Sequence, residues 1–530
     1  MNKSTNRLVA NAAIIVTTAL LMSKITAFLR TTMIPNVISN KTDLDAFYMS
    51  MSISDFMFNL LIGGAISSAI IPILSGYIAK KDEQQGWIAI STYINIMFIV
   101  VIIICIIGSI FASQIVNFTA NNFSIEQKLL TTDLTRILLI SVLFFMLSGL
   151  INGILYSYKQ FAAASFGPSI YNITAVLSIF VLKNHGVKAI AAGIAFSNFV
   201  YFIFQFSFSF KYFIKFYKFR FSLRDSGFKK LLFISIPLII SASVVQINIF
   251  TSTIFTGMLK TGSLTAYRNA SETWQLPYGI FALGIGFAML PSLSEKVALN
   301  QMNEYKILVN RSLKVVLLLN LPAVVTFIII NRSIISIIYK WSNNINIVYT
   351  GQILLYFTIA LLAQSFLSII IRAFYALKDT KTPLITSSIT IIINFGLCFL
   401  FLTYTNLDAA GMALSYSSTA VFNAFCLTFI LHKKVDLIEL KSFGVFISKL
   451  MFSSILMGTI LYFTHKFSPY NYNNTIFSIN SKFKELLWFI FEISLCGIIY
   501  ISTVIILKVE EALYLKNIVL NKINLGNPKK

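Results

Sequence analysis

Charged residues, and acidic ones above all, are scarce in this chain of 530 residues. Asp, Glu, Lys and Arg make up 12% of it, whereas they make up about 25% of a typical soluble domain. Hydrophobic residues reach 57%, and the mean hydropathy is +0.80. The apolar runs have the length of membrane-spanning helices, so we predict an all-α polytopic membrane protein.

Signatures of metal, redox and nucleotide chemistry are missing as well. The four cysteines lie singly in apolar stretches without CxxC spacing, which predicts neither a disulfide framework nor a metal site. No P-loop motif occurs, so any work that the protein performs must be driven by ion gradients or the membrane potential. We expect no cofactor, no catalytic residue and no enzymatic activity.

The first apolar run also lacks a signal-peptide cleavage site. It extends from Val9 through Lys24 to Met33, which is long enough to cross a bilayer. We therefore expect the first helix to remain in the protein as a membrane span.

Apolar runs of about 20 residues predict fourteen transmembrane helices. Their approximate ranges are 10–34, 45–77, 87–113, 130–156, 160–182, 187–209, 230–257, 264–292, 312–331, 348–375, 382–404, 408–431, 445–464 and 485–507.

An internal duplication relates the first twelve spans. Pro72 and Pro291 are 219 residues apart, as are Lys159 of YSYKQ and Lys378 of YALKD, while AAGIAFS and AAGMALS are 218 apart. This offset places the second span on the eighth and the sixth on the twelfth, so the repeat unit is six helices. An even number keeps both copies in one orientation, which predicts two six-helix lobes in a parallel pseudo-repeat followed by two C-terminal helices.

The distribution of Lys and Arg predicts the domains and their orientation. We expect a first lobe at 1–210, a basic linker at 211–229, a second lobe at 230–435, and a C-terminal helix pair with a tail at 436–530. With the N-terminus in the cytoplasm, the loops on that side hold most of the loop Lys and Arg, which places both termini inside. The net charge of +23 then reflects topology and anionic headgroups, and no nucleic-acid partner is expected.

Two basic residues in the first predicted span are unusual because an ionisable group at mid-bilayer costs about 3 kcal/mol. Lys24 lies about ten residues from either end of the span, which indicates a wet cavity. Arg30 lies on the same helix, nearer its end.

The duplicated second and eighth spans also contain charges. Asp45 and Asp55 occur in the second, together with Gly63 and Gly64, and small residues of this kind let a neighbouring backbone approach. In the eighth, Arg268 and Glu272 are four residues apart and share a helix face, where they either pair or line a cavity.

Five segments, in this order, decide what the chain resembles. They are SKITAFLR (Ser23–Arg30), TDLDAFYMS (Thr42–Ser50), IGGAISSAIIPILS (Ile62–Ser75), QLPYGIFALGIG with LPSLS (Gln275–Ser294) and RAFYALKDTKTP (Arg372–Pro383). With them and its fourteen spans, the chain resembles the MurJ/MviN family of lipid II flippases over nearly its whole length. That family belongs to the superfamily that also holds multidrug exporters and O-antigen flippases.

The resemblance implies two lobes around a central cationic cavity and a last helix pair with a groove for a lipid tail. The implied substrate is lipid II, the undecaprenyl-pyrophosphate-linked disaccharide-pentapeptide, moved by alternating access across the bacterial cytoplasmic membrane. Membrane lipids and cell-wall synthesis enzymes are the other expected partners.

The resemblance also suggests roles for individual residues. Lys24 and Arg30 match the family's two basic residues in the first helix, and Asp45 matches the acidic residue that opens the second. A guanidinium binds phosphate bidentately and an ammonium acts as a point charge, so we expect Lys24, Arg30 and Arg268 to bind the diphosphate. Asp45, Asp55 and Glu272 are expected to line or gate the cavity.

The sequence departs from the family pattern in three places. Phe58 and Asn59 stand where members have a basic residue, and Glu272 stands where members have an arginine. The seventh and eleventh spans contain no Asp or Glu, although some members bind sodium there through carboxylates.

Three other functions remain open. A flippase for another lipid-linked oligosaccharide needs the same cavity. A multidrug or cation exporter of the same superfamily would favour an acidic cavity and twelve spans. A membrane glycosyltransferase or polymerase would need catalytic carboxylates and a sizeable outer domain, whereas the largest predicted outer loop, near 465–484, is short and basic.

Overall fold

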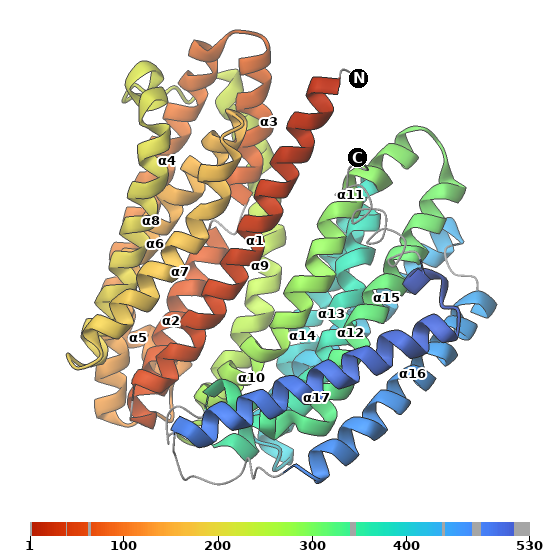
Figure 1. Cartoon of the computed structure of the whole chain (residues 1–530). Helices are drawn as coiled ribbons and strands as arrows, with labels where there is room; N and C mark the ends of the chain where they lie inside the picture. The colour runs from red at the N-terminus through yellow and green to blue at the C-terminus, as the bar shows by residue number, and fades with distance from the viewer. Residues whose placement is uncertain are drawn as a thin grey trace, which may run out of the picture. The chain divides into compact units, whose positions relative to one another are not determined.

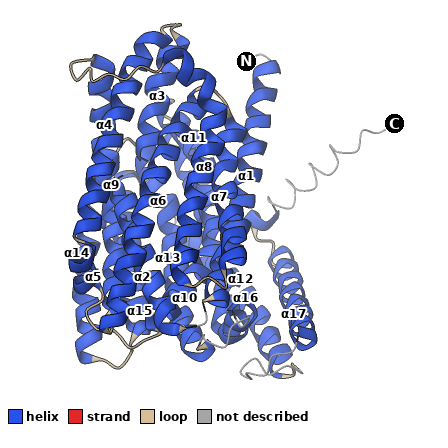
Figure 2. Cartoon of the chain, turned by 90° about the vertical axis from the view of Figure 1, so that its left-hand side faces the viewer, coloured by secondary structure: helices blue, strands red, loops and turns tan. Residues whose placement is uncertain are grey.

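The computed structural model describes residues 3–38, 40–61, 65–339, 346–436, 440–468 and 479–513, and every regular element in these ranges is helical (Figures 1 and 2). Eleven of the described helices are long and apolar enough to cross a membrane. The prediction of an all-α polytopic membrane protein is therefore confirmed, while fourteen spans remains a prediction. Gly63 and Gly64 lie outside the described residues.

The chain divides into two compact units, Met1–Arg268 and Asn269–Lys530. The helices of the first unit are α1 (Lys3–Val37), α2 (Lys41–Leu61), α3 (Ala65–Ala79), α4 (Glu83–Ile110), α5 (Ala112–Thr119), α6 (Ile125–Ser157), α7 (Phe161–Leu182), α8 (Val187–Phe216), α9 (Ser226–Gly257) and the first residues of α10 (Ser263–Pro277).

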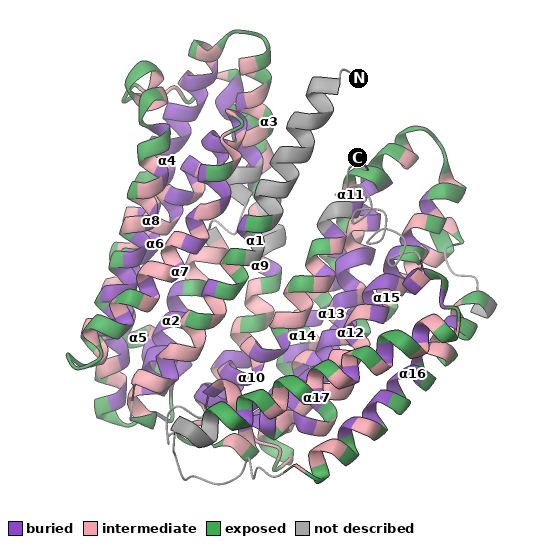
Figure 3. Cartoon of the chain, in the orientation of Figure 1, coloured by how far each residue is buried: buried purple, intermediate pink, exposed green. Residues whose placement is uncertain are grey.

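Two large apolar clusters contribute to the core of the first unit. In one, Phe47 and Ile53 of α2 pack with Leu134 of α6 and Ile179 of α7. In the other, Trp87 of α4 packs among residues of α3, α6 and α9. The Trp87 indole donates to the Tyr158 hydroxyl at 3.0 Å, so this buried N–H is satisfied. The buried stripes in Figure 3 follow these clusters along α4 and α6.

The second unit contains the rest of α10, the π-helix η1 (Tyr278–Leu283), α11 (Gly284–Ala298), α12 (Met302–Tyr339), α13 (Ile347–Ala376), α14 (Lys381–Tyr404), α15 (Ala409–Val435), α16 (Leu440–Lys466) and α17 (Ile479–Ile506). Its main apolar cluster joins α11, α12, α13 and α15.

The π-helix lies within QLPYGIFALGIG, one of the segments that carry the family resemblance. A π-turn widens the helix and often marks a functional position. Beside it, Gly286 of α11 lets the Arg372 guanidinium approach closely, because a Cβ at Gly286 would lie 2.9 Å from the guanidinium carbon. Arg372 in turn donates to the Ser368 carbonyl at 2.5 Å. A larger residue at 286 would displace this side chain.

Two helix ends recur at the spacing of the sequence repeat. Lys81 and Asn300 are 219 residues apart and have φ of 60° and 57°, and Lys159 and Lys378, also 219 apart, both have φ of 60°. At each position the next residue donates its N–H to the carbonyl five residues earlier, which is the Schellman arrangement that ends a helix. The 219-residue spacing therefore recurs in the backbone conformation as well as in the amino-acid sequence.

The unit boundary differs from the predicted lobe boundary. The repeat assigns 230–257 to the second copy, but α9 packs against α2, α3 and α4 and falls in the first unit. Phe228 and Leu231 at its start are buried in the cluster around Trp87. Sequence repeats record ancestry, whereas compact units record which apolar faces are in contact, so the two divisions need not coincide.

Candidate functional site

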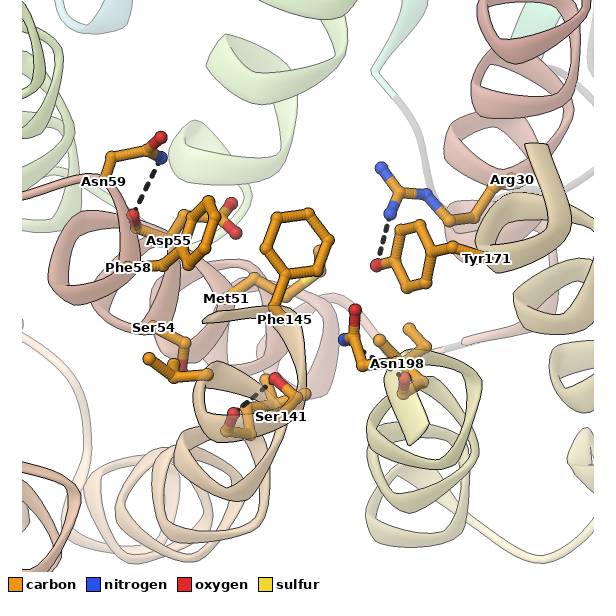
Figure 4. Close-up of a pocket in the computed structure, with 13 residues that line it drawn as sticks. Arg30, Met51, Ser54, Asp55, Phe58, Asn59, Ser141, Phe145, Tyr171 and Asn198 are labelled. Atoms are coloured by element: carbon orange, nitrogen blue, oxygen red, sulfur yellow. Dashed lines mark hydrogen bonds between the residues drawn. The ribbon is translucent and has the colours of Figure 1, made fainter. Parts of the chain in front are cut away.

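A pocket of about 320 Å³ lies among α1, α2, α6, α7 and α8 of the first unit (Figure 4). Its polar lining includes Arg30, Asp55, Asn59, Tyr171 and Asn198. All of these belong to helices that sequence analysis placed inside the membrane. A pocket lined by such groups within apolar helices is the arrangement that a polar ligand or water requires.

Arg30 and Tyr171 form one side of the pocket. The Arg30 guanidinium donates from Nη1 to the Tyr171 hydroxyl at 2.5 Å, and its carbon lies 5.0 Å from the centre of the same ring. The ring contact stabilises the cation, and the hydrogen bond directs it. Tyr171 thus holds Arg30 in place without neutralising its charge.

Asp55 forms the opposite side, as Figure 4 shows, with the Phe145 ring between it and Arg30. An Asp55 carboxylate oxygen accepts from Arg268 Nη2 at 3.4 Å, and the two side chains are 51% and 24% exposed. This ion pair joins α2 to the start of α10. Arg268 is therefore neutralised at least in part by a carboxylate, whereas Arg30 faces a neutral phenol.

Three buried polar atoms of the pocket have no hydrogen-bond partner among the described residues. They are Arg30 Nε, Ser54 Oγ and Asn198 Oδ1. A buried donor or acceptor without a partner costs about 1–3 kcal/mol, so such groups are rare unless a water or ligand satisfies them. Three such atoms in one pocket are typical of a surface that water or a polar ligand occupies.

An aromatic wall completes the pocket. The rings of Phe58 and Phe145 meet edge to face at 4.2 Å between centroids, and Phe145 lies 5.9 Å from Tyr171 in the same manner. Asn59 stands beside Phe58, and its amide donates to the Asp55 carbonyl at 2.8 Å. Phe58 and Asn59, which stand where family members have a basic residue, thus both line this pocket.

The other predicted site residues lie elsewhere. Lys24 is exposed on α1, outside the pocket lining. Asp45 is only 1% exposed and accepts hydrogen bonds from the Gly262 N–H at 2.5 Å, the Thr265 N–H at 2.9 Å and the Thr265 hydroxyl at 2.6 Å. It therefore fastens α2 to the start of α10. Glu272 is half-buried on α10 in the second unit.

Three residues of the pocket lining, Tyr171, Phe145 and Asn198, were not predicted from the sequence. A tyrosine or phenylalanine in an apolar helix resembles ordinary core sequence, so it gives no signal of its own. Asn198 follows directly after AAGIAFS, one of the repeated segments, and an asparagine inside a predicted span is the signal that was available.

The chain matches the family described as "Lipid II flippase MurJ" over residues 34–482. A "Probable lipid II flippase MurJ" of Buchnera aphidicola subsp. Acyrthosiphon pisum is 25% identical over 490 residues, which cover 90% of this chain and 95% of the relative. One of Haemophilus influenzae is 24% identical over 515 residues, which cover 93% and 98%.

Solved structures show the same fold. "Lipid II flippase MurJ, inward closed conformation" has a TM-score of 0.75 at 24% identity and covers 93% of this chain and 100% of its own. An inward-facing multidrug resistance MATE family transporter has a TM-score of 0.62 at 15% identity, covering 79% and 94%. The resemblance found in the sequence is confirmed. Because the family match extends over most of its length, the chain belongs to the lipid II flippase MurJ family.

Proposed function

We propose that this protein moves lipid II from the inner to the outer leaflet of the bacterial cytoplasmic membrane. It acts as a transporter rather than an enzyme, and its Arg30 pocket binds the polar headgroup. The observation that supports this proposal most directly is the Arg30 guanidinium, held by Tyr171 with its Nε unsatisfied among the described residues. The family supplies the identity of the substrate.

The chemistry of the headgroup explains why such a pocket is needed. A diphosphate and two sugars lose their hydration in hydrocarbon, at a cost of several kcal/mol for each unpaired polar group. A positioned guanidinium replaces water around a phosphate with charge-assisted hydrogen bonds. Asn59, Asn198 and Ser54 provide donors and acceptors for hydroxyl groups, and the rings of Phe58 and Phe145 provide an apolar face for a sugar ring.

We further propose that Arg30 is the principal diphosphate ligand and that Arg268 is a secondary one, since Asp55 already pairs with Arg268. Lys24, exposed two turns before Arg30 on α1, would attract the anion before it reaches the pocket. Asp45 would hold α2 against the start of α10 while the headgroup crosses the membrane. Glu272 would line the route that the headgroup takes.

The transport cycle in this proposal is alternating access by two six-helix lobes of parallel orientation, fourteen spans in all, with both termini in the cytoplasm. The recurring Schellman ends at Lys81 and Asn300, and at Lys159 and Lys378, support the duplication on which the lobes rest. The lipid tail stays in the bilayer while the headgroup crosses. Cell-wall synthesis enzymes would take up the product in the outer leaflet.

The test is complementation of a bacterium depleted of its lipid II flippase, combined with a measurement of lipid II in the outer leaflet. The wild-type chain should restore both growth and delivery, and Arg30→Ala should abolish delivery at normal membrane levels. Arg136→Ala is the matched control, because Arg136 is half-exposed on α6 and outside the pocket lining. If the wild-type chain restores another lipid-linked oligosaccharide but not lipid II, the substrate assignment is wrong.

A further inference from the structure

A second pocket, of about 370 Å³, lies in the second unit between α12, α16 and the segment that follows α17. Lysines from these three elements converge on it, namely Lys314, Lys449 and Lys508, together with Glu510 and Glu511. None of them takes part in the Arg30 pocket. The pocket therefore needs its own explanation.

Lys314 forms the floor of this lysine pocket. Its ammonium lies 3.4 Å from a Glu511 carboxylate oxygen and donates to the Ser442 hydroxyl at 3.3 Å, and it lies 5.5 Å from the centre of the Phe446 ring. The side chains of Lys314 and Glu511 are only 15% and 7% exposed. This buried pair connects α12 to the end of the described chain and is structural.

Lys449 and Lys508 have no ion pair within 4.0 Å among the described residues. Lys449 is half-buried on α16, and Lys508 is exposed. Three lysines and two glutamates leave the pocket one positive charge in excess. An anion with a single negative charge would balance it.

The backbone at the end of α17 builds the pocket. Lys508 has φ of 51°, and the Val509 N–H donates to the Val504 carbonyl at 3.0 Å, which is again a Schellman end. This turn directs Val509 inward, where it is 2% exposed, and leaves Lys508 at the rim. A non-glycine residue in the left-handed region is uncommon, and here it aims a cation at the cavity.

Exposed apolar side chains occur on both α16 and α17, the helices that lead to the lysine pocket. Val445 and Phe452 of α16 are 52% and 59% exposed, and Ile501 and Ile506 of α17 are 57% and 74% exposed. Figure 3 shows exposed residues along the length of α17. In the proposed topology α16 begins and α17 ends at the cytoplasmic face. A cationic pocket beside such surfaces suits an amphiphile with an anionic head and acyl chains.

We infer that this lysine pocket binds the phosphodiester headgroup of an anionic phospholipid from the cytoplasmic leaflet. Lys449 and Lys508 contact the phosphate, Lys314 and Glu511 hold the floor, and the acyl chains lie along α16 and α17. The single excess charge favours a monoanionic phosphodiester over a diphosphate, so this site differs in chemistry from the Arg30 pocket. The bound lipid would fasten the C-terminal helix pair to α12.

The test measures binding of phosphatidylglycerol to the purified full-length chain in detergent by native mass spectrometry, with phosphatidylcholine as the neutral comparison. Lys449→Gln and Lys508→Gln should each weaken phosphatidylglycerol binding about 5-fold, since one lysine near an anionic lipid contributes about that factor. Lys466→Gln, at the other end of α16, is the matched control and should bind as the wild type does. Glu510→Gln removes a negative charge from the pocket and should strengthen binding by a similar factor. A misfolded variant would bind more weakly, so stronger binding cannot result from misfolding.

A second arm separates a lipid from a free phosphate. Soluble glycerol phosphate at millimolar concentration should not displace the lipid, because it lacks the acyl chains that α16 and α17 would hold. Displacement by glycerol phosphate would overturn the lipid assignment. Wild-type affinity in the Lys449→Gln, Lys508→Gln double variant, or equal binding of phosphatidylcholine, would overturn the site. None of these outcomes bears on whether the chain moves lipid II.

Discussion

The two ends of α2 have the same side chain in opposite surroundings. Asp45 is buried, accepts three hydrogen bonds and holds the start of α10. Asp55, three turns later, is half-exposed, pairs with Arg268 and lines the Arg30 pocket. A carboxylate in a membrane helix therefore does not identify a functional site by itself. The number of donors around it and its exposure to the pocket decide its role.

Removal of the Asp45 carboxylate tests whether the buried Asp of α2 is structural. It should have the largest effect of these substitutions on the free energy of unfolding. Asp45→Ala leaves two backbone N–H groups and a hydroxyl without their acceptor, at about 1–3 kcal/mol for each buried donor. We expect a loss of about 3 kcal/mol or more in unfolding free energy, measured by thermal or denaturant unfolding in detergent. Asp43→Ala, two residues earlier and only half-buried, is the control and should change stability by less than about 1 kcal/mol. Equal effects would mean that Asp45 is not structural.

Substitution of Arg30 tests the pocket beside Asp55. Arg30→Lys keeps the charge but loses the planar fork and the ring contact with Tyr171, so we expect delivery of lipid II to fall about tenfold with unchanged stability. Lys24→Ala removes a cation from the same helix outside the pocket lining and should reduce delivery less. If Lys24→Ala is the more damaging change, the cation that matters on α1 lies outside the pocket.

A double-mutant cycle on Arg268 and Asp55 measures how strongly this ion pair influences ligand binding. Because the pair is partly exposed, Asp55→Asn should change stability by no more than about 1 kcal/mol. It should also remove a negative charge beside Arg268, so the diphosphate of lipid II should be attracted more strongly and lipid II should bind a few-fold more tightly, as measured by native mass spectrometry.

In the same assay Arg268→Ala should weaken binding by less than Arg30→Ala does. The effect of Asp55→Asn should disappear when Arg268 is absent. A persistent effect would show that Asp55 acts on the ligand without Arg268.

Asp379 is a half-buried carboxylate outside the membrane spans, and its substitution should have the smallest effect. Burial raises the pKa of its carboxyl, but hydrogen bonds from Lys434 and from the Thr382 N–H and hydroxyl outweigh burial and bring the pKa down to about 2. An unfolded Asp has a pKa of about 3.9, so this stabilisation is present above pH ~4 and is lost as the pH falls toward 2.

We expect Asp379→Asn to cost about 1 kcal/mol at pH 7, a value reduced by solvent around the exposed Lys434. The difference from wild type should shrink at pH 3. Thermal unfolding of both proteins at the two pH values measures it. A constant difference would mean that the charge of Asp379 is irrelevant.

Much of the fold could be predicted from the sequence because burial in lipid constrains composition directly. Apolar runs of about 20 residues predict spans, and the 219-residue spacing found in the repeated segments recurs between left-handed helix ends of the backbone. These signals depend on local sequence alone. The packing of α9 against α2, α3 and α4 did not follow from them, since a repeat does not specify which apolar faces meet.

The candidate site shows the same division. The sequence determined that Arg30, Asp55 and Arg268 are costly in a membrane and need partners, because insertion of a charge is penalised wherever it lies. Only the tertiary structure decided which partners they have. Tyr171 lies 141 residues from Arg30 and Asp55 lies 213 from Arg268, and neither helical periodicity nor the internal repeat specifies contacts between residues at these separations. Helix packing alone brought these side chains together, left Lys24 outside the pocket lining, and placed Phe58 and Asn59 in it.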